Sequence, residues 1–186
     1  MDAAEFISNQ CPSSVGGGGT QPTFFAASGE DTNLEDKCVD LCYMIHVGMN
    51  VMDVRALARE MRRVVNDEGP GPGVFGVFDV VRVGDGVLEY PVPWAGEGGE
   101  GCEVKRWEMY ERAFEGEGWG VGEVLDVTEE CEGMLRKAVG RGGGEGGGGW
   151  GINVVMGENA WEKQANLLRG LEEGVLGVKM GKWKTV

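Results

Sequence analysis

Apolar residues follow two different spacings along the chain, and these predict alternating strands and helices. Residues 39–45 and 74–81 are mostly apolar runs of strand length, which is typical of strands buried inside a parallel sheet. Between them, residues 51–65 place apolar side chains at helical spacing and arginines on the opposite side, the pattern of an amphipathic helix. A strand, a helix and a second strand in this order predict a right-handed crossover between parallel strands.

The ends of that helix carry their own signals. Asn50 is a candidate N-cap because its side chain can accept a hydrogen bond from the first helical turn. The stretch from Asn66 to Pro70 combines polar residues with glycine and proline, which ends a helix. The rest of the chain continues the alternation and indicates an α/β fold, with helices predicted over 103–115, 128–139 and 161–171 and strands over 121–127 and 175–184.

Glycine is the most unusual part of the composition, with 35 glycines in 186 residues. Many stand in runs diluted by glutamate, at 96–101 and 142–149. Such runs bury no apolar surface, so they are predicted to be flexible loops. Residues 1–23 hold proline, serine and a tetraglycine, which predicts a disordered leader. Residues 24–186 are then one domain, long enough to bury a hydrophobic core.

The formal net charge of -14 argues against nucleic acid as a partner, because phosphate binding depends on clustered lysine and arginine. It is compatible with a cationic ligand. The five cysteines are irregularly spaced, so they indicate neither a metal site nor a disulfide framework and favour a reducing, cytoplasmic location. The amino terminus has no basic segment followed by a long apolar stretch. It therefore predicts neither a signal peptide nor a membrane partner.

Three blocks of residues, taken together, carry a resemblance to a known family. They are Met44–Asn50, then Asp79–Arg82 with Tyr90–Ala95, and finally Ile152–Glu158 with the residues up to Gly174. Their order and spacing resemble the carboxy-terminal half of class I S-adenosylmethionine-dependent methyltransferases, in the type 11 branch that includes sarcosine/dimethylglycine methyltransferases. The resemblance implies a partial Rossmann-like sheet, strands four to seven of the family, with flanking helices and glycine-rich loops.

The same resemblance implies S-adenosylmethionine as cofactor and methyl transfer to a small molecule, with nitrogen as the favoured acceptor atom. By position, Asp31 or Thr32 would lie beside the adenine, and His46 would face both cofactor and substrate. Methyl transfer is an in-line displacement that depends on near-attack geometry. A neutral imidazole could orient an amine or accept its proton, which makes His46 the candidate catalytic residue. The alternative is that this single histidine is only a hydrogen-bonded residue at a strand end.

The acceptor side of the implied site rests on further residues. Tyr90 and Trp94 would wall the acceptor pocket, where an aromatic face attracts an ammonium or sulfonium group by about 0.5–2 kcal/mol. The alternative is that both rings only pack onto the core. Met156 would line the same pocket, or fill a gap in the core as methionine often does. Asp79 and Arg82 form either a pocket pair or a surface ion pair.

The glycine-rich first motif of the family has no counterpart in the sequence. Glycine patterns at 96–101, 116–120 and 142–147 do not follow an apolar strand, so none fits such a loop. One flank of strand four is then unpaired, which predicts aggregation, a homo-oligomer or a partner that supplies the missing half. Two hypotheses stay open: part of a working methyltransferase, and a non-catalytic remnant or interaction module. A generic α/β binding protein is less favoured, because three blocks match in order.

Overall fold

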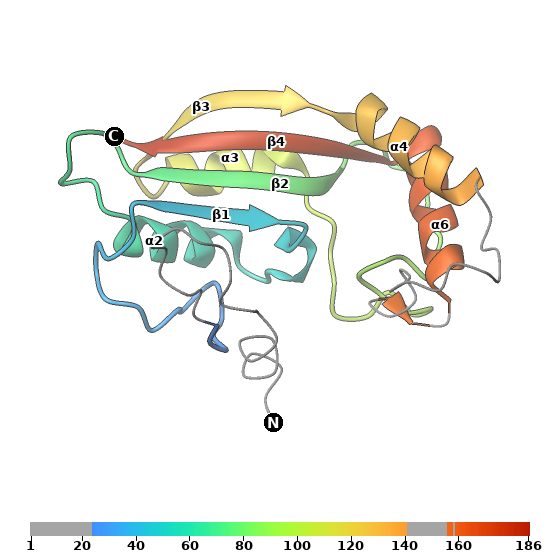
Figure 1. Cartoon of the computed structure of the whole chain (residues 1–186), viewed down its shortest axis with the longest axis horizontal. Helices are drawn as coiled ribbons and strands as arrows, with labels where there is room; N and C mark the ends of the chain where they lie inside the picture. The colour runs from blue at the N-terminus through green and yellow to red at the C-terminus, as the bar shows by residue number, and fades with distance from the viewer. Residues whose placement is uncertain (1–23, 141–155, 158) are drawn as a thin grey trace, which may run out of the picture.

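The computed structural model describes residues 24–140, 156–157 and 159–186. In these ranges the strands form one mixed sheet in the order β1-β2-β4-β3 (Figure 1). Strand β1 is parallel to β2, as predicted, whereas β4 runs antiparallel to both β2 and β3. The strand bounds are β1 (Leu41–Ile45), β2 (Val74–Arg82), β3 (Trp119–Asp126) and β4 (Leu176–Thr185).

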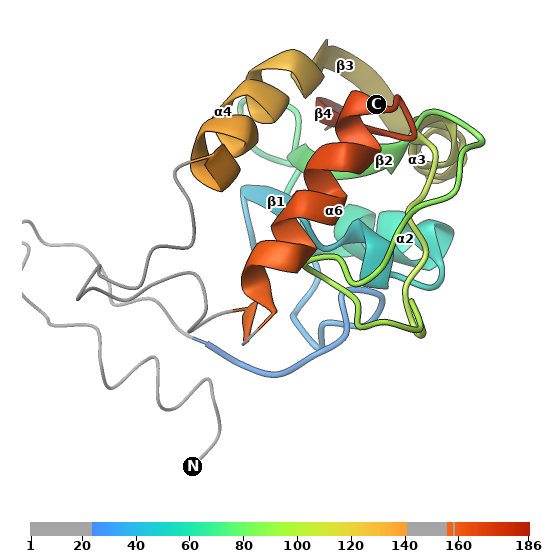
Figure 2. The same cartoon turned by 90° about the vertical axis from the view of Figure 1, so that its right-hand side faces the viewer.

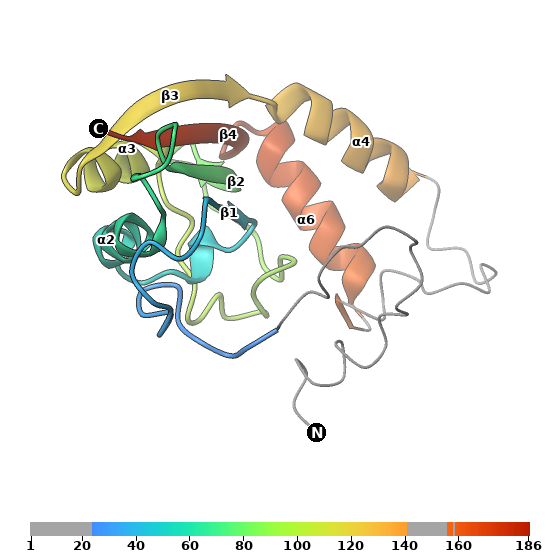
Figure 3. The same cartoon turned by 60° about the vertical axis from the view of Figure 1, so that its left-hand side comes forward.

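Helices lie on both sides of this sheet but cover it unequally. Helices α2 and α3 lie behind the strands in Figure 1, and α4 and α6 lie on the other side, near the end where β1 and β2 finish (Figure 2 and Figure 3). The arrangement confirms the predicted α/β fold with a partial Rossmann-like sheet. The helix bounds are η1 (Gly48–Asn50, a 3-10 helix), α2 (Val54–Val64), α3 (Trp107–Glu115), α4 (Thr128–Gly140) and α6 (Ala160–Glu172).

The predicted start of the helix over 51–65 was wrong. Asn50 is the last residue of η1, and the N-cap of α2 is Asp53, whose carboxylate accepts from Arg55 N and Ala56 N. The cause is a distant contact, because Glu30 Oε1 accepts hydrogen bonds from the backbone N–H of Met52 at 3.0 Å and of Asp53 at 2.8 Å. These bonds hold the backbone before the cap outside the helix.

The helix predicted over 103–115 also begins later, at Trp107. Residues 103–105 precede the helix and connect η1 to the end of β2, since Glu103 N donates to Met49 O at 2.8 Å and Arg82 N donates to Lys105 O at 2.9 Å. The strand predicted over 121–127 begins two residues earlier, at Trp119. The other boundaries differ from the prediction by one or two residues.

The face of the sheet under α2 and α3, called the covered face below, carries the main core. Phe75 stacks on Phe114 with ring centroids 5.0 Å apart, and Phe114 stacks on Trp183 at 4.8 Å. Trp119 closes the cluster, and its indole N–H donates to Ala58 O of α2 at 3.0 Å. All these rings are fully buried, so aromatic contact holds the two helices against the strands.

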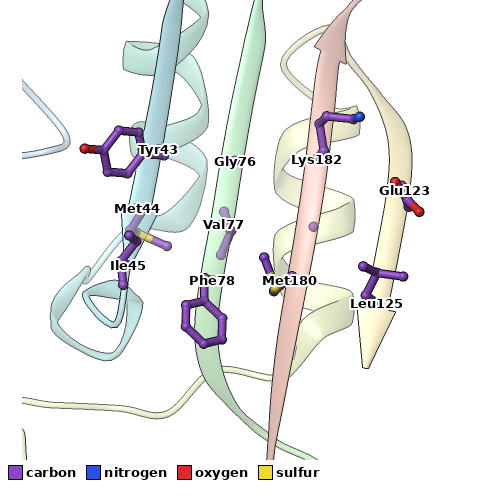
Figure 4. A pocket seen from close by; sticks show the side chains of 11 residues that line it. Tyr43, Met44, Ile45, Gly76, Val77, Phe78, Glu123, Leu125, Met180 and Lys182 are labelled. Atoms are coloured by element: carbon purple, nitrogen blue, oxygen red, sulfur yellow. The ribbon is translucent and has the colours of Figure 1, made fainter. Parts of the chain in front are cut away.

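The opposite face has a stretch, called the open face below, that no helix of the described part of the chain lies over. Its side chains stand at alternate strand positions and include large apolar groups, with Tyr43 70% exposed. They line a shallow hollow of about 320 Å³ (Figure 4). Strand β1 also ends the sheet, so its outer edge pairs with no described strand. The open face consists of Leu41, Tyr43, Ile45, Gly76, Phe78, Glu123, Leu125, Met180 and Lys182.

Some predictions concern residues that the structure does not describe. The leader 1–23, the glycine loop 142–149 and the part of the third block at 152–155 lie outside the described residues.

Candidate functional site

The residue that follows β1, His46, has an unusual backbone. Its φ of 51° is left-handed, a conformation that non-glycine residues rarely adopt and that clusters at functional sites. His46 N donates to Phe78 O at 2.8 Å, which ties the turn to β2. The imidazole ring lies 4.6 Å from the Phe78 ring, and 44% of the side chain is exposed. His46 is therefore held in place and still reachable from solvent.

Beneath this turn lies Asp79, a carboxylate that is completely buried on the covered face. Its Oδ2 accepts from Gly48 N at 3.0 Å and from the Tyr110 hydroxyl at 2.9 Å, and its Oδ1 accepts from Val80 N. Oδ1 also lies 4.0 Å from His46 Nδ1. Neither alternative offered for Asp79 and Arg82 holds, because the Arg82 guanidinium donates to Gly86 O instead.

Burial sets the protonation of these groups. It raises the pKa of Asp79 to about 6, although hydrogen bonds from Tyr110, Val80 and Gly48 oppose the rise. Burial lowers the pKa of His46 below its ordinary value. The pKa of Tyr110 is raised by burial and by the neighbouring Asp79 charge. Near neutral pH the imidazole is therefore uncharged, the form that can accept a proton.

A groove of about 550 Å³ runs along the free edge of β1, between that strand and the start of α2. Its lining is mainly apolar, and Glu30 supplies a carboxylate whose Oε1 already accepts the two backbone bonds before α2. The groove is lined by Ser28, Gly29, Glu30, Tyr43, Met44, Ile45, Val47, Asn50, Val51, Met52, Leu57, Met61 and Phe75.

The predicted adenine neighbours lie just beyond this lining. Asp31 is exposed and closes a turn through Asp31 N to Ser28 O. Thr32 is committed to α2, because its N–H and hydroxyl both donate to Glu60 Oε1, at 2.8 and 2.5 Å. Glu60 is held in turn by Arg63, which lowers the pKa of Glu60 to about 2. Asp31 is thus the freer of the two to meet a ligand.

The segment 90–95 packs on the core cluster that contains Met49 of η1, the 3-10 helix that follows His46. Tyr90 and Trp94 pack against a buried cluster that also contains Met49 and Val80. Asn166 Nδ2 of α6 donates to Pro91 O at 3.0 Å, which fixes the segment from the other side. The segment therefore follows β2 in the chain and shares its core cluster with the residues just after His46.

Two features of the segment bear on its rings. The Tyr90 ring lies against Gly99, where an added Cβ would approach it to 2.6 Å. The indole Nε1 of Trp94 is buried and has no hydrogen-bond partner among the described residues. Met156 lies four residues before α6, where its carbonyl accepts from Lys163 Nζ at 2.8 Å and its sulfur lies 3.8 Å from Gln164 Nε2.

Sequence reasoning did not single out Tyr110 or Glu30 as site residues, and it gave Asp79 the wrong partner, Arg82. Asp79 did carry a signal, because it is the one charged residue inside the apolar run 74–81. Tyr110 and Glu30 gave none, since their contacts join parts of the chain that are far apart in sequence. Within the described ranges, no group of three His, Cys, Asp or Glu residues could hold a metal ion. No described helix is long and apolar enough to cross a bilayer.

Comparison with protein-family models gives a match to a methyltransferase domain over residues 6–70. Comparison with curated proteins gives no match. Among solved structures, the geranyl diphosphate C-methyltransferase from Streptomyces coelicolor A3(2), crystallised with S-adenosyl-L-homocysteine, aligns with a TM-score of 0.64 and 14% identity. The alignment covers 89% of this chain and 55% of that one.

These observations decide the fold. The chain has the fold of a class I S-adenosylmethionine-dependent methyltransferase. A proposed sarcosine dimethylglycine methyltransferase from Galdieria sulphuraria aligns with a TM-score of 0.56, 12% identity, and coverage of 88% of this chain and 59% of that one. The phosphoethanolamine N-methyltransferase 2 of Haemonchus contortus gives a TM-score of 0.62, 11% identity, and coverage of 85% and 36%.

The coverage agrees with the partial sheet. The methyltransferase-like chain spans 55%, 59% and 36% of these three solved chains. Much of each neighbour therefore has no counterpart in this sequence. The family match also begins at residue 6, inside the segment that the sequence predicts to be a leader.

Proposed function

We propose that the chain is the carboxy-terminal half of a methyltransferase domain that transfers a methyl group from S-adenosylmethionine to a small molecule. The observation that carries the proposal is the turn at His46, which stands at the carboxyl end of two parallel strands. In open α/β sheets, ligands bind outside the carboxyl ends of the strands. His46 lies there between Ile45 and Val47, which line the apolar groove, and three residues before Met49, whose core cluster the Tyr90 and Trp94 rings pack against.

The groove along β1 suits one end of the cofactor. Apolar side chains of β1 and α2 would receive the adenine ring, and Glu30 or Asp31 would face its polar edge. The cofactor, when bound, supplies an electrophilic methyl group on a sulfonium. The described residues offer no glycine-rich strand-to-helix loop for its methionine end, and we propose that a complementary half supplies that part of the site.

His46 would hold the acceptor and take its proton. The neutral imidazole that burial favours is the form suited to an amine nucleophile. Tyr90 and Trp94 would shield the acceptor from water, and their ring faces would favour a cationic amine. Nitrogen is our proposed acceptor atom, supported by the acidic chain and by the N-methyltransferase among the structural neighbours. The C-methyltransferase neighbour makes carbon the competing acceptor.

A non-catalytic remnant or interaction module is the second candidate function. The observation that favours it is the exposed apolar surface of the open face together with the unpaired edge of β1. An exposed patch of this kind marks an interaction site. Under the first proposal the same surface is covered by the complementary half, and under the second it contacts a partner without methyl transfer.

Calorimetric titration with S-adenosylhomocysteine separates the two. Met52 lines the groove and is 72% exposed, whereas Met134 on α4 is 71% exposed and lies away from it. We expect micromolar binding by the chain, about tenfold weaker binding after Met52→Glu (about 1.4 kcal/mol), and no change after Met134→Glu. A folded sample that gives no heat, alone and mixed with a methyltransferase first half, would leave the interaction module as the function.

A further inference from the structure

The left-handed backbone at His46 is maintained by contacts from two other elements. His46 N is bonded to Phe78 O of β2, and two residues later Gly48 N is bonded to Asp79 Oδ2. Asp79 is anchored in turn by the hydroxyl of Tyr110 from α3. The turn after β1 is thus tied to one buried carboxylate.

Gly48 shows how tightly this contact is built. A Cβ added at Gly48 would lie 1.8 Å from the Tyr110 hydroxyl oxygen and 2.1 Å from Asp79 Oδ2. Only a residue without a side chain lets the backbone N–H reach the carboxylate at this distance. The glycine, the carboxylate and the hydroxyl therefore act as one structural unit.

We propose that Asp79 is the positioning residue of His46: its carboxylate fixes the turn through Gly48 N–H and presents a negative charge to the imidazole Nδ1. A role of Asp79 in methyl transfer rests on the proposed function. Its contacts with Gly48 and its position beside His46 do not depend on that function. A histidine oriented by a buried carboxylate keeps one nitrogen directed at the carboxylate, which leaves the other nitrogen for an acceptor molecule.

The other ionisable groups around Asp79 are few among the described residues. Tyr110 faces it from α3 and His46 from the turn after β1. Lys179 is its register partner on β4 and is also the register partner of Asp126 on β3, whose pKa is lowered mainly by the Thr128 hydroxyl and to a smaller extent by Lys179. The carboxylate is thus the nearest charged partner of the imidazole, at 4.0 Å.

The chain contains a single histidine, so its imidazole proton signal in an NMR titration needs no assignment. Asp79→Asn keeps one oxygen for Gly48 N–H and for Tyr110 and removes the charge, while its amide nitrogen takes the place of Oδ1 and gives up the bond from Val80 N. We expect the titration midpoint of His46 to move to lower pH in this variant. Asp40→Asn, which removes an exposed carboxylate just before β1, at the opposite end of that strand from His46, is the matched control and should leave the midpoint where it was.

Two further variants keep the test decisive. Tyr110→Phe removes one donor to the carboxylate, which disfavours its charged form, and the His46 midpoint should again move down. Gly48→Ala should change the chemical shift of the His46 imidazole signal at a fixed pH, because the added methyl group displaces the turn. A His46 midpoint that is the same in the chain, in a folded Asp79→Asn and in Tyr110→Phe would overturn the proposal.

The measurement needs no cofactor, so it is independent of methyl transfer. S-adenosylhomocysteine added to the same samples then reports on the proposed function alone. If the midpoint moves in Asp79→Asn but the ligand never perturbs the His46 signal, in the chain alone and mixed with a methyltransferase first half, the positioning role stands and the methyltransferase proposal fails.

Discussion

The covered face and the open face belong to the same four strands, yet they differ in what they contact. On the covered face, Phe75 is 1% exposed and stacks inside an aromatic cluster, whereas Tyr43 one strand away on the open face is 70% exposed. Buried aromatic rings stabilise a fold through their packing against one another. Apolar side chains exposed to water contribute no such packing, and a patch of them marks an interaction surface. Within the described residues, one face of the sheet is therefore packed under helices and the other carries apolar side chains that no helix covers.

Chain handedness explains why the open face and the free edge of β1 occur together. A right-handed crossover from β1 to β2 places α2 on the covered face. A strand–helix–strand unit that continued the sheet in the opposite direction, from the free edge of β1, would place its helix on the opposite face. Under the proposed function, the unpaired edge and the open face would together receive the complementary half.

Removal of a ring from each face is the strongest test of this comparison. Phe75→Ala should lower the free energy of unfolding by about 3–5 kcal/mol, because it leaves a cavity in a packed aromatic cluster. Tyr43→Ala should change it by less than about 0.5 kcal/mol, as expected for an exposed side chain. Urea unfolding followed by tryptophan fluorescence measures both. Equal losses at the two positions would mean that the open face is packed in solution.

The free energy of unfolding should depend on pH through two buried carboxylates, Glu60 and Asp79, whose contributions change with pH in opposite directions. The pKa of Glu60 is lowered to about 2, chiefly by Arg63, so its contribution to stability is present above its ordinary value of 4.5 and is lost as pH falls towards 2. The pKa of Asp79 is raised from 3.8 to about 6, chiefly by burial. Its contribution is therefore present below pH 3.8 and is lost as pH rises through 6.

Two substitutions separate these contributions. Asp79→Asn should make the chain more stable at pH 8 by up to about 3 kcal/mol, the free energy equivalent of a shift of about two pKa units. Glu60→Gln should make it less stable at pH 7 and flatten the loss between pH 4.5 and 2. Thermal melts across pH 3–8 measure both. An Asp79→Asn variant that is less stable at pH 8 than at pH 4, relative to the unmodified chain, would contradict the assignment.

Two glycines on neighbouring strands provide a finer test. Gly181 of β4 lies on the covered face, where an added Cβ would approach the Trp107 ring to 2.4 Å, whereas at Gly76 of β2 on the open face the nearest atom is 3.7 Å away. Gly181→Ala should cost about 1–3 kcal/mol through overpacking. Gly76→Ala should be neutral or slightly stabilising, because alanine loses less conformational entropy than glycine when a strand forms. The urea unfolding midpoints of the two variants measure this difference in stability.

The parts of this fold that could be predicted from sequence are those set by local pattern. The apolar runs 39–45 and 74–81 and the amphipathic helix between them specify a parallel pair whatever lies around them. The contacts that build the candidate site are different in kind. Glu30 sets the start of α2 from 23 residues away, and Tyr110 reaches Asp79 from 31 residues away. No periodicity in the sequence encodes such pairings, so Asn50 was taken for the cap and Asp79 for an ion-pair residue.

A substitution on the open face should have the smallest effect on stability. The same substitution should have the largest effect on association. Tyr43→Lys should change the free energy of unfolding by less than about 0.5 kcal/mol. It should nevertheless reduce self-association and the binding of an apolar dye, because a lysine on an edge strand discourages further pairing. Met134→Lys on α4, at a similarly exposed position, should leave both unchanged. Sedimentation velocity and dye fluorescence on the two variants measure this difference. If the unmodified chain is monomeric and binds no dye, the open face is already covered by residues of the same chain, and the contrast between the two faces disappears.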